Sequence, residues 1–173
     1  MLKCESTSLL LSYSRIAEPA DRDALTMFIN KAFAKDQYPF KDRARTNIEE
    51  IAEHLETGYF LLVETEGKLA GAIYVEFRDD QRGYLAMLTV GPDHQRQGLG
   101  KRLRESAEQF CRDHGCRTVE AVVLASKSDL VAMYQREGYR ISGEVPYEQP
   151  EILAEPSSLL LIEKELSSQT SSI

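Results

Sequence analysis

The stretch YLAMLTVGPDHQRQGLGK, residues 84–101, decides the fold because it reads as a strand, a glycine-rich turn and the start of a helix. Residues 84–90 are apolar and rich in strand-forming residue types, and Gly91-Pro92 ends the run. Gly98 and Gly100 fall in the first turn of the helix, where backbone N–H groups have no partner inside the helix. The helix has an apolar face at spacings of three and four, formed by Leu99, Leu103, Ala107 and Phe110.

This turn predicts a cradle for a phosphate or pyrophosphate group. Glycine has no Cβ, so an anion can approach the backbone closely, and the positive end of the helix dipole favours it. Arg96, Lys101 and Arg102 add positive charge there. Two common phosphate motifs do not fit. GxxxxGK(S/T) would need a glycine at Gln95 and a hydroxyl residue at Arg102, and GxGxxG would need a glycine at Leu103.

Helix and strand patterns alternate along the rest of the chain. Helical periodicity follows Asp21 as far as Phe33 and returns from Ile48 to Leu55, ahead of Gly58. A last helix is expected over residues 128–137. Strands are expected over residues 10–18, 59–64, 69–77, 84–90, 117–124, 139–145 and 158–166. The strands between 59 and 90 read as an antiparallel meander, and strand 117–124 should lie parallel to strand 84–90, since a helix connects the two.

Two signatures in this order resemble those of the GNAT superfamily of N-acyltransferases. Gln95-x-x-Gly98-x-Gly100 is similar to the acetyl-CoA motif R/Q-x-x-G-x-G/A, and residues 130–139 (LVAMYQREGY) are similar to a helix ending in Y-x-x-x-G-(F/Y). The resemblance covers about residues 12–166. It implies an α/β fold with a mixed central sheet of about six to seven strands, four helices and splayed cofactor strands in the middle. We expect one such domain over 10–166, a flexible N-terminus over 1–9 and a disordered Ser-rich tail over 167–173.

The resemblance also assigns residues to acetyl-CoA, which would be the co-substrate. The backbone of Leu88 and Val90 would pair with the pantetheine arm. Tyr134 would lie near the CoA sulfur and protonate the departing thiolate. Many relatives have an asparagine seven residues before this tyrosine, where this chain has Lys127, flanked by Ser126 and Ser128. The N–H groups of the loop would hold the pyrophosphate, which places Arg96, Gln97, Gly98, Leu99, Gly100 and Lys101 around it.

An amine must lose a proton to attack a thioester, so the site needs a base as well as a donor to the carbonyl. The backbone N–H of Leu88 is the candidate donor. Glu76, on the strand beside the cofactor strand, is the first candidate base, and Glu144, Asp36 and Tyr38 are alternatives. A water chain to solvent is a further alternative.

The family shapes its acceptor site with two connections, which here are residues 35–40 and 145–151. Tyr38, Phe40 and Tyr147 could form its walls. Asp36, Glu148 and Glu151 could attract a cationic amine, although aromatic residues that anchor surface loops would give the same pattern. Small polyamines, aminoglycosides, amino acids and protein N-termini or lysines all remain open as acceptors.

The composition is typical of a soluble globular protein. The chain has 173 residues and a net charge of −7, so a broad nucleic-acid footprint is not expected. No apolar run has the length of a signal-peptide core or a membrane span, so we expect a cytoplasmic protein with no membrane partner. Three cysteines and three histidines, scattered along the chain, predict neither a disulfide framework nor a metal site.

The sequence therefore predicts an N-acetyltransferase that moves an acetyl group from acetyl-CoA to a primary amine by direct attack. The acceptor would be a small molecule or a peptide, and a homodimer is possible by analogy with relatives. A non-catalytic acyl-CoA sensor, or an interaction domain of the same fold, is the alternative.

Overall fold

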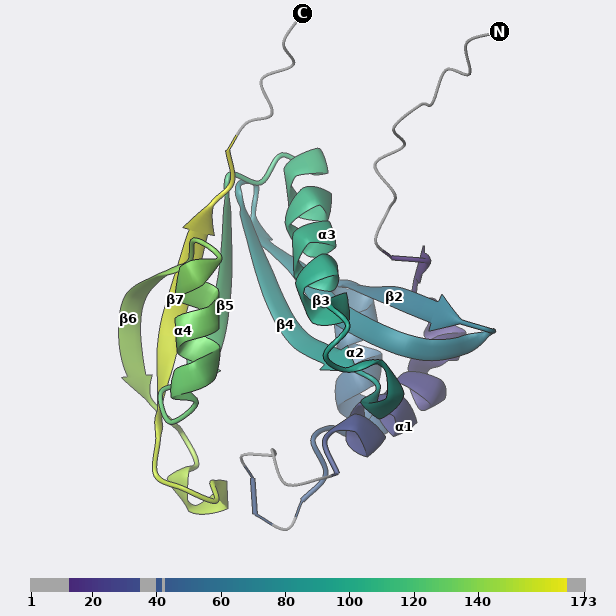
Figure 1. Cartoon of the computed structure of the whole chain (residues 1–173), viewed down its shortest axis with the longest axis horizontal. Coiled ribbons are helices and arrows are strands. Elements are labelled where there is room, and N and C mark those ends of the chain that lie inside the picture. The colour runs from purple at the N-terminus through teal and green to yellow at the C-terminus, as the bar shows by residue number, and fades with distance from the viewer. Residues whose placement is uncertain (1–12, 35–39, 42, 168–173) are drawn as a thin grey trace, which may run out of the picture.

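The computed structural model describes residues 13–34, 40–41 and 43–167 (Figure 1). Its strands are β1 (Arg15–Ile16), β2 (Tyr59–Thr65), β3 (Lys68–Asp79), β4 (Arg82–Val90), β5 (Thr118–Leu124), β6 (Arg140–Pro146) and β7 (Ser158–Glu165). Its α-helices are α1 (Arg22–Ala32), α2 (Ile48–Thr57), α3 (Leu99–Asp113) and α4 (Ser128–Arg136), and three short 3-10 turns are η1 (Pro19–Asp21), η2 (Pro92–His94) and η3 (Pro150–Ile152).

The predicted fold class is confirmed, with seven strands in one mixed sheet and four α-helices in the described part of the chain. The first strand is shorter than predicted, since only Arg15–Ile16 pair with β2 and residues 10–12 lie outside the described residues. The predicted flexible segment 1–9 and the tail beyond Ser167 also lie outside them.

The strand order is β1-β2-β3-β4-β5-β7-β6. Strands β2, β3 and β4 form the predicted antiparallel meander, and β4 and β5 are parallel, as the helical crossover between them requires. Helices α3 and α4 cover one face of the sheet, and α1 and α2 lie behind the other (Figure 1). Each face has its own core, because successive side chains of a strand point to opposite sides. Leu103, Phe110 and Val119 belong to the core under α3, and Leu25, Ile51 and Phe60 belong to the core under α1 and α2.

A β-bulge interrupts β4 at Met87. Ala86 lies opposite Tyr74 and Thr89 lies opposite Ala72, so β4 advances by three residues where β3 advances by two. Met87 has a positive φ of 52°, and the Thr89 hydroxyl donates a hydrogen bond to the Met87 carbonyl at 3.0 Å. A bulge of this kind bends its strand and increases the local twist.

The bulge also changes which side chains face α3. If β4 alternated regularly from Leu85, Met87 would point to the same core as Leu85. Met87 instead joins the core under α1 and α2, while Leu88 and Val90 pack on the core under α3. The extra residue therefore aims both predicted pantetheine-binding residues toward the start of α3.

Strands β4 and β5 pair at one end only. Residues Arg82–Tyr84 lie opposite Thr118–Glu120, and no pairing follows. Figure 1 shows the two strands separating toward the end of the sheet at which α3 begins. This confirms the predicted splay, and it leaves β4 from Leu85 onward without a β5 partner.

None of the helices in the described ranges is long and apolar enough to cross a membrane. Over the same residues, no group of three or more His, Cys, Asp or Glu side chains is arranged to hold a metal ion. Cys111 and Cys116 are both buried free thiols.

Candidate active site

The loop between β4 and α3 has the backbone of an anion cradle. Arg96 and Gly98 both have positive φ angles, of 61° and 77°, and Gly98 is the N-cap residue of α3. No side chain caps this helix, so no protein oxygen at the N-cap position competes for the N–H groups of its first turn. Gln95 anchors the loop through its side-chain amide, which donates to the Val90 carbonyl at 3.3 Å. Successive N–H groups near left-handed residues form a concave nest that suits an anion.

Glycine is required at position 98 by the backbone conformation, but not at position 100. A side chain at Gly98 would be strained, since its φ of 77° lies in the left-handed region. Gly100 is different: a Cβ there would meet Arg104, Val90 and Leu88 only at 3.6–3.9 Å, which is ordinary contact. The protein itself therefore does not need glycine at 100. A glycine that packing does not require is what the acetyl-CoA motif predicts at this position.

The loop residues predicted to surround the pyrophosphate differ in their exposure. Arg96, Gln97, Gly98 and Lys101 are exposed, Gly100 is half-buried, and Leu99 is buried as the first core residue of α3. Leu99 anchors the start of α3 in the core, while the backbone of the exposed residues is accessible to a ligand. Leu88 and Val90 are half-buried and lie within reach of a Cβ at Gly100.

Tyr134 lies on α4, half-buried, on the same face of the sheet as α3. Its ring makes a T-shaped contact with Tyr139 at 5.1 Å between centroids, and the Arg104 guanidinium carbon lies 5.5 Å from its centroid. Within the described residues nothing forms a hydrogen bond with the Tyr134 hydroxyl, in contrast to Tyr139, which donates to Glu108 at 2.9 Å. Burial raises the pKa of Tyr134, against the positive charge of Arg104, so the phenol stays protonated at neutral pH.

An ion pair holds α4 against α3. The Arg104 Nε donates to Glu137 Oε2 at 2.8 Å, and its Nη2 donates to Oε1 at 2.6 Å, which is a bidentate pair. Arg104 is 5% exposed, and the Glu137 side chain is 19% exposed. Sequence reasoning missed this pair. A charged residue four positions after Gly100, beside the apolar face of the helix, was the available signal.

Glu76 lies on β3 and faces away from α3, toward the side of α1 and α2. It accepts a hydrogen bond from the Tyr74 hydroxyl at 3.0 Å and pairs loosely with Arg78 at 3.5 Å. Its cross-strand neighbour on β4 is Tyr84. The Tyr74 hydroxyl also contacts Thr57 at 2.8 Å, and burial raises its pKa to about 12. Glu76 is thus held in place beside the strand that borders the opening.

Of the other candidate bases, Glu144 lies far from the opening between β4 and β5, and two lie outside the described residues. Glu144 lies on β6, and β7 and β5 separate that edge strand from β4. Ser158 donates a hydrogen bond to Glu144 there. The sheet therefore does not bring Glu144 to the opening. Asp36 and Tyr38 lie outside the described residues.

The two connections predicted to shape the acceptor site meet in space. Phe40 forms an isolated β-bridge with Leu153, and the Lys41 N–H donates to the Ile152 carbonyl at 2.7 Å. The rings of Phe40 and Tyr147 lie 6.0 Å apart. In Figure 1 the connection between β6 and β7 lies beneath the end of the sheet at which β4 and β5 separate.

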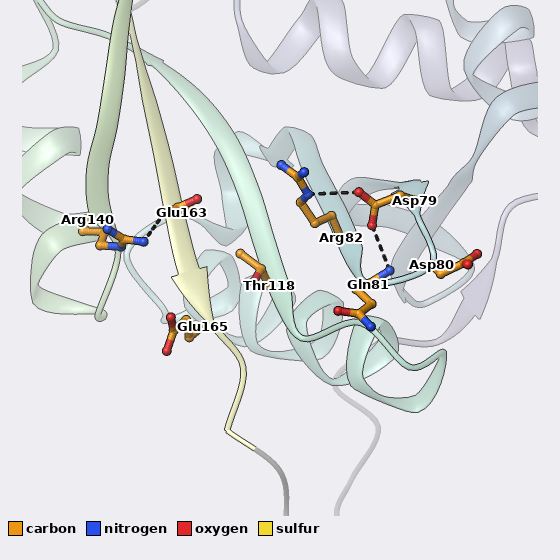
Figure 2. A pocket seen from close by; sticks show the side chains of 8 residues that line it. All are labelled: Asp79, Asp80, Gln81, Arg82, Thr118, Arg140, Glu163 and Glu165. Carbon is orange, nitrogen blue, oxygen red and sulfur yellow. Dashed lines mark hydrogen bonds and ion pairs between the residues drawn. The ribbon is translucent and has the colours of Figure 1, made fainter.

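A surface pocket lies at the opposite end, where β4 and β5 are still paired (Figure 2). It is lined by residues 79–82, Thr118, Arg140, Glu163 and Glu165. Its arginines are already neutralised, Arg82 by Asp79 and Arg140 by Glu163. It contains none of the predicted site residues, so we do not take it as the active site.

A sequence profile of the acetyltransferase (GNAT) family matches residues 24–139. The chain belongs to this family. The match includes β2 to β5, the loop before α3 and the whole of α4, which are the elements that build the cradle and carry Tyr134.

The curated relatives that this GNAT chain matches are mycothiol acetyltransferases. A mycothiol acetyltransferase from Cellulomonas flavigena is 28% identical over 144 residues, which is 75% of this chain and 41% of the relative. The chain thus spans less than half the length of that relative.

Solved structures agree on the fold. The ribosomal-protein-S18-alanine N-acetyltransferase from Escherichia coli superposes with a TM-score of 0.70 at 20% identity, over 92% of this chain and 97% of the other. A GNAT family acetyltransferase from Elizabethkingia anophelis with acetyl-CoA bound gives 0.62 at 16% identity, over 75% and 96%.

Proposed function

We propose that this chain is an N-acetyltransferase that transfers the acetyl group of acetyl-CoA to a primary amine. The observation that carries the proposal is the uncapped, glycine-lined start of α3 at the mouth between the separated strands β4 and β5. Membership of the GNAT family and the acetyl-CoA bound to the Elizabethkingia protein support it. We also propose that the protein is cytoplasmic and can form a homodimer.

In this proposal the loop binds the pyrophosphate through the N–H groups of residues 96–101, and the backbone of Leu88 and Val90 pairs with the pantetheine arm. Charge-assisted hydrogen bonds of this kind are stronger than neutral ones. When bound, acetyl-CoA supplies an acyl group activated as a thioester. The Leu88 N–H would stabilise the negative charge that develops on the carbonyl oxygen.

Proton transfers complete the reaction. The amine nitrogen forms a bond to the acyl carbon and the carbon–sulfur bond breaks, so one proton must leave the amine and one must reach the sulfur. Tyr134 would donate its proton to the thiolate, and Glu76, directly or through water, would accept the amine proton. Burial keeps the Tyr134 phenol in its protonated form at neutral pH, which is the form that this step uses.

Replacing Glu76 with glutamine should lower kcat/KM about 100-fold at neutral pH, the low end for a general base, because water can partly replace a half-exposed carboxylate. The deficit should shrink at alkaline pH, where the amine loses its proton unaided. The rate is measured by release of free CoA thiol across a pH series.

Glu64→Gln is the matched control, since Glu64 is a half-exposed strand glutamate on β2, paired with Arg15. Equal rates for wild type and Glu76→Gln at every pH would remove Glu76 from the mechanism.

The proposal is tested first by calorimetric titration with acetyl-CoA, with CoA and ATP as comparisons, and then by thiol release with a panel of amines. Binding of acetyl-CoA and CoA without ATP, followed by amine-dependent release, is expected. Binding without release for any amine would favour the acyl-CoA sensor. No binding would leave the chain with the fold of the family and without its cofactor.

Gly100→Leu should weaken acetyl-CoA binding about 10–100-fold, since a side chain there displaces the phosphate from one charge-assisted hydrogen bond or more. The melting temperature should hold or rise, because a Cβ at 100 meets nothing closer than 3.6 Å and glycine is a poor helix former. Glu105→Leu, at an exposed position one turn along α3, is the control and should bind normally. Unchanged affinity in Gly100→Leu would overturn the cradle assignment.

A further inference from the structure

Three arginines contact aromatic rings on the side of the sheet that Glu76 faces, the side of α1 and α2. The Arg78 guanidinium carbon lies 4.0 Å from the centroid of Tyr84. The guanidinium carbon of Arg43 lies 5.2 Å from the centroid of Phe40, and that of Arg45 lies 5.9 Å from the centroid of Phe33. Arg78 comes from β3, while Arg43 and Arg45 precede α2.

Tyr84 and Tyr147 connect these arginines into one cluster. Burial raises the pKa of Tyr84, against the charges of Arg78 and Arg45. Burial likewise raises the pKa of Tyr147, against the charges of Arg43 and Arg45. Arg45 is therefore near both tyrosines, and Tyr147 in turn is 6.0 Å from Phe40, the ring that Arg43 covers.

Arg43 and Arg45 have no carboxylate partner among the described residues, whereas Arg15 and Arg104 have strong ones. Arg45 is also half-buried. A guanidinium presents five N–H donors in a planar fork that matches a carboxylate, and burying it without a partner is unfavourable. Ring contacts with Phe33 leave those donors free for a ligand.

Acidic groups on this side do not neutralise the cluster. Glu76 accepts from Tyr74 and lies 3.5 Å from Arg78. Glu50 accepts from the Thr46 hydroxyl at 2.7 Å, and its charge acts on Tyr147, as does that of the exposed Glu148. These contacts account for Arg78, whereas Arg43 and Arg45 have no carboxylate partner among the residues that the structure describes.

The cluster lies next to the proposed reaction centre. Tyr84 is the cross-strand neighbour of Glu76, and Tyr84 is close enough to Tyr134 to raise the pKa of that residue. A molecule with its amine at Glu76 would therefore have Tyr84 beside it and Arg45 beyond.

We propose that the acceptor is a small amine that carries a carboxylate on the same molecule, such as a free amino acid, and that Arg45 binds this carboxylate. The inference rests on the proposed acetyltransferase function and names its substrate class. It differs from the expectation that acidic residues at 36, 148 and 151 attract a cationic amine, and it rests on the arginines that have no carboxylate partner in the described part of this surface.

The test compares matched amines that differ only in the carboxylate. Alpha-, beta- and omega-amino acids are each assayed beside their amides and beside a polyamine, by thiol release from acetyl-CoA. We expect wild type to favour at least one amino acid over its amide by about 10–100-fold in kcat/KM, the contribution of a charge-assisted hydrogen bond or two. Amides or the polyamine reacting as well as every amino acid would overturn the inference.

Arg45→Gln should remove that preference by raising KM for the amino acid, with little change for its amide and no change in the affinity for acetyl-CoA. Arg22→Gln, an exposed arginine paired with Asp23 on α1, is the control and should keep the preference. An amino-acid preference that survives Arg45→Gln would exclude Arg45 as the carboxylate-binding residue.

The outcomes separate this inference from the proposed function. Calorimetric titration with each amino acid and its amide measures the carboxylate preference without turnover. Suppose that the protein binds amino acids through Arg45 but transfers no acetyl group. That result would contradict the proposed acetyltransferase function and support the carboxylate site. Acetyl transfer to amides or a polyamine at rates equal to those for every amino acid would do the reverse: it would support the acetyltransferase and exclude the carboxylate site.

Discussion

Tyr134→Phe should lower kcat about 10²–10⁴-fold, the usual contribution of a general acid, and leave the melting temperature unchanged. The thiolate loses its proton donor, whereas the protein loses nothing, because no described group forms a hydrogen bond with that hydroxyl. Affinity for acetyl-CoA should also be retained. The measurements are thiol release at saturating substrate, thermal unfolding and calorimetric titration with acetyl-CoA.

Tyr139 provides a matched control, since its ring contacts that of Tyr134 at 5.1 Å. Its hydroxyl donates to the buried Glu108, which is 4% exposed and also accepts from Lys164 at 2.8 Å. Tyr139→Phe should therefore cost about 1–3 kcal/mol in the free energy of unfolding, as a buried acceptor loses its donor, and should leave kcat near wild type. If both variants kept full activity, Tyr134 would be a packing residue and the proton would come from solvent.

Arg104→Ala should lower the free energy of unfolding by about 3 kcal/mol, because it leaves Glu137 without its bidentate partner. We expect the low end of the range for a buried pair, since the Glu137 side chain keeps 19% of its exposure. Denaturant unfolding measures this loss. The double variant Arg104→Met with Glu137→Met should recover most of it, because an apolar pair can replace a buried ion pair.

Arg82→Ala is the comparison at the surface. Arg82 pairs with Asp79 and Glu120, each at 3.0 Å, but its side chain is 55% exposed. Solvent screens such pairs, so the loss of stability should be much smaller than that in Arg104→Ala. A loss in Arg104→Ala no larger than that of Arg82→Ala would mean that the α3–α4 contact does not depend on this ion pair.

Local chemistry made most of the fold and the cradle predictable. The glycines at 98 and 100, the breaker at Gly91-Pro92 and the apolar spacing of α3 act within one turn or one strand, so the sequence reports them directly. Gly100 is the clearest case. Its role was inferred from the motif, and the structure finds no packing reason for it.

Features that depend on tertiary context could not be predicted. The bulge at Met87 interrupts a run that reads as an unbroken strand, with no glycine to mark it. On α4, Leu130 is 40% exposed, whereas Val131 packs on the core together with Tyr134, a difference that residue type does not indicate. Arg45 lies in a segment without periodicity, so nothing in the sequence indicated its aromatic neighbours.

The separation of β4 from β5 has a consequence for how this sheet relates to its ligand. Most sheets expose free hydrogen-bonding edges only at their outermost strands, whereas this one has two in its interior, from Leu85 onward on β4 and beyond Glu120 on β5. An extended amide-containing chain that enters between them would act as an internal strand addition, with main-chain recognition on its flanks. Since such a chain binds only the folded sheet, the two halves of the domain would be joined partly by their own substrate, and the stability of the protein would follow the supply of acyl donor.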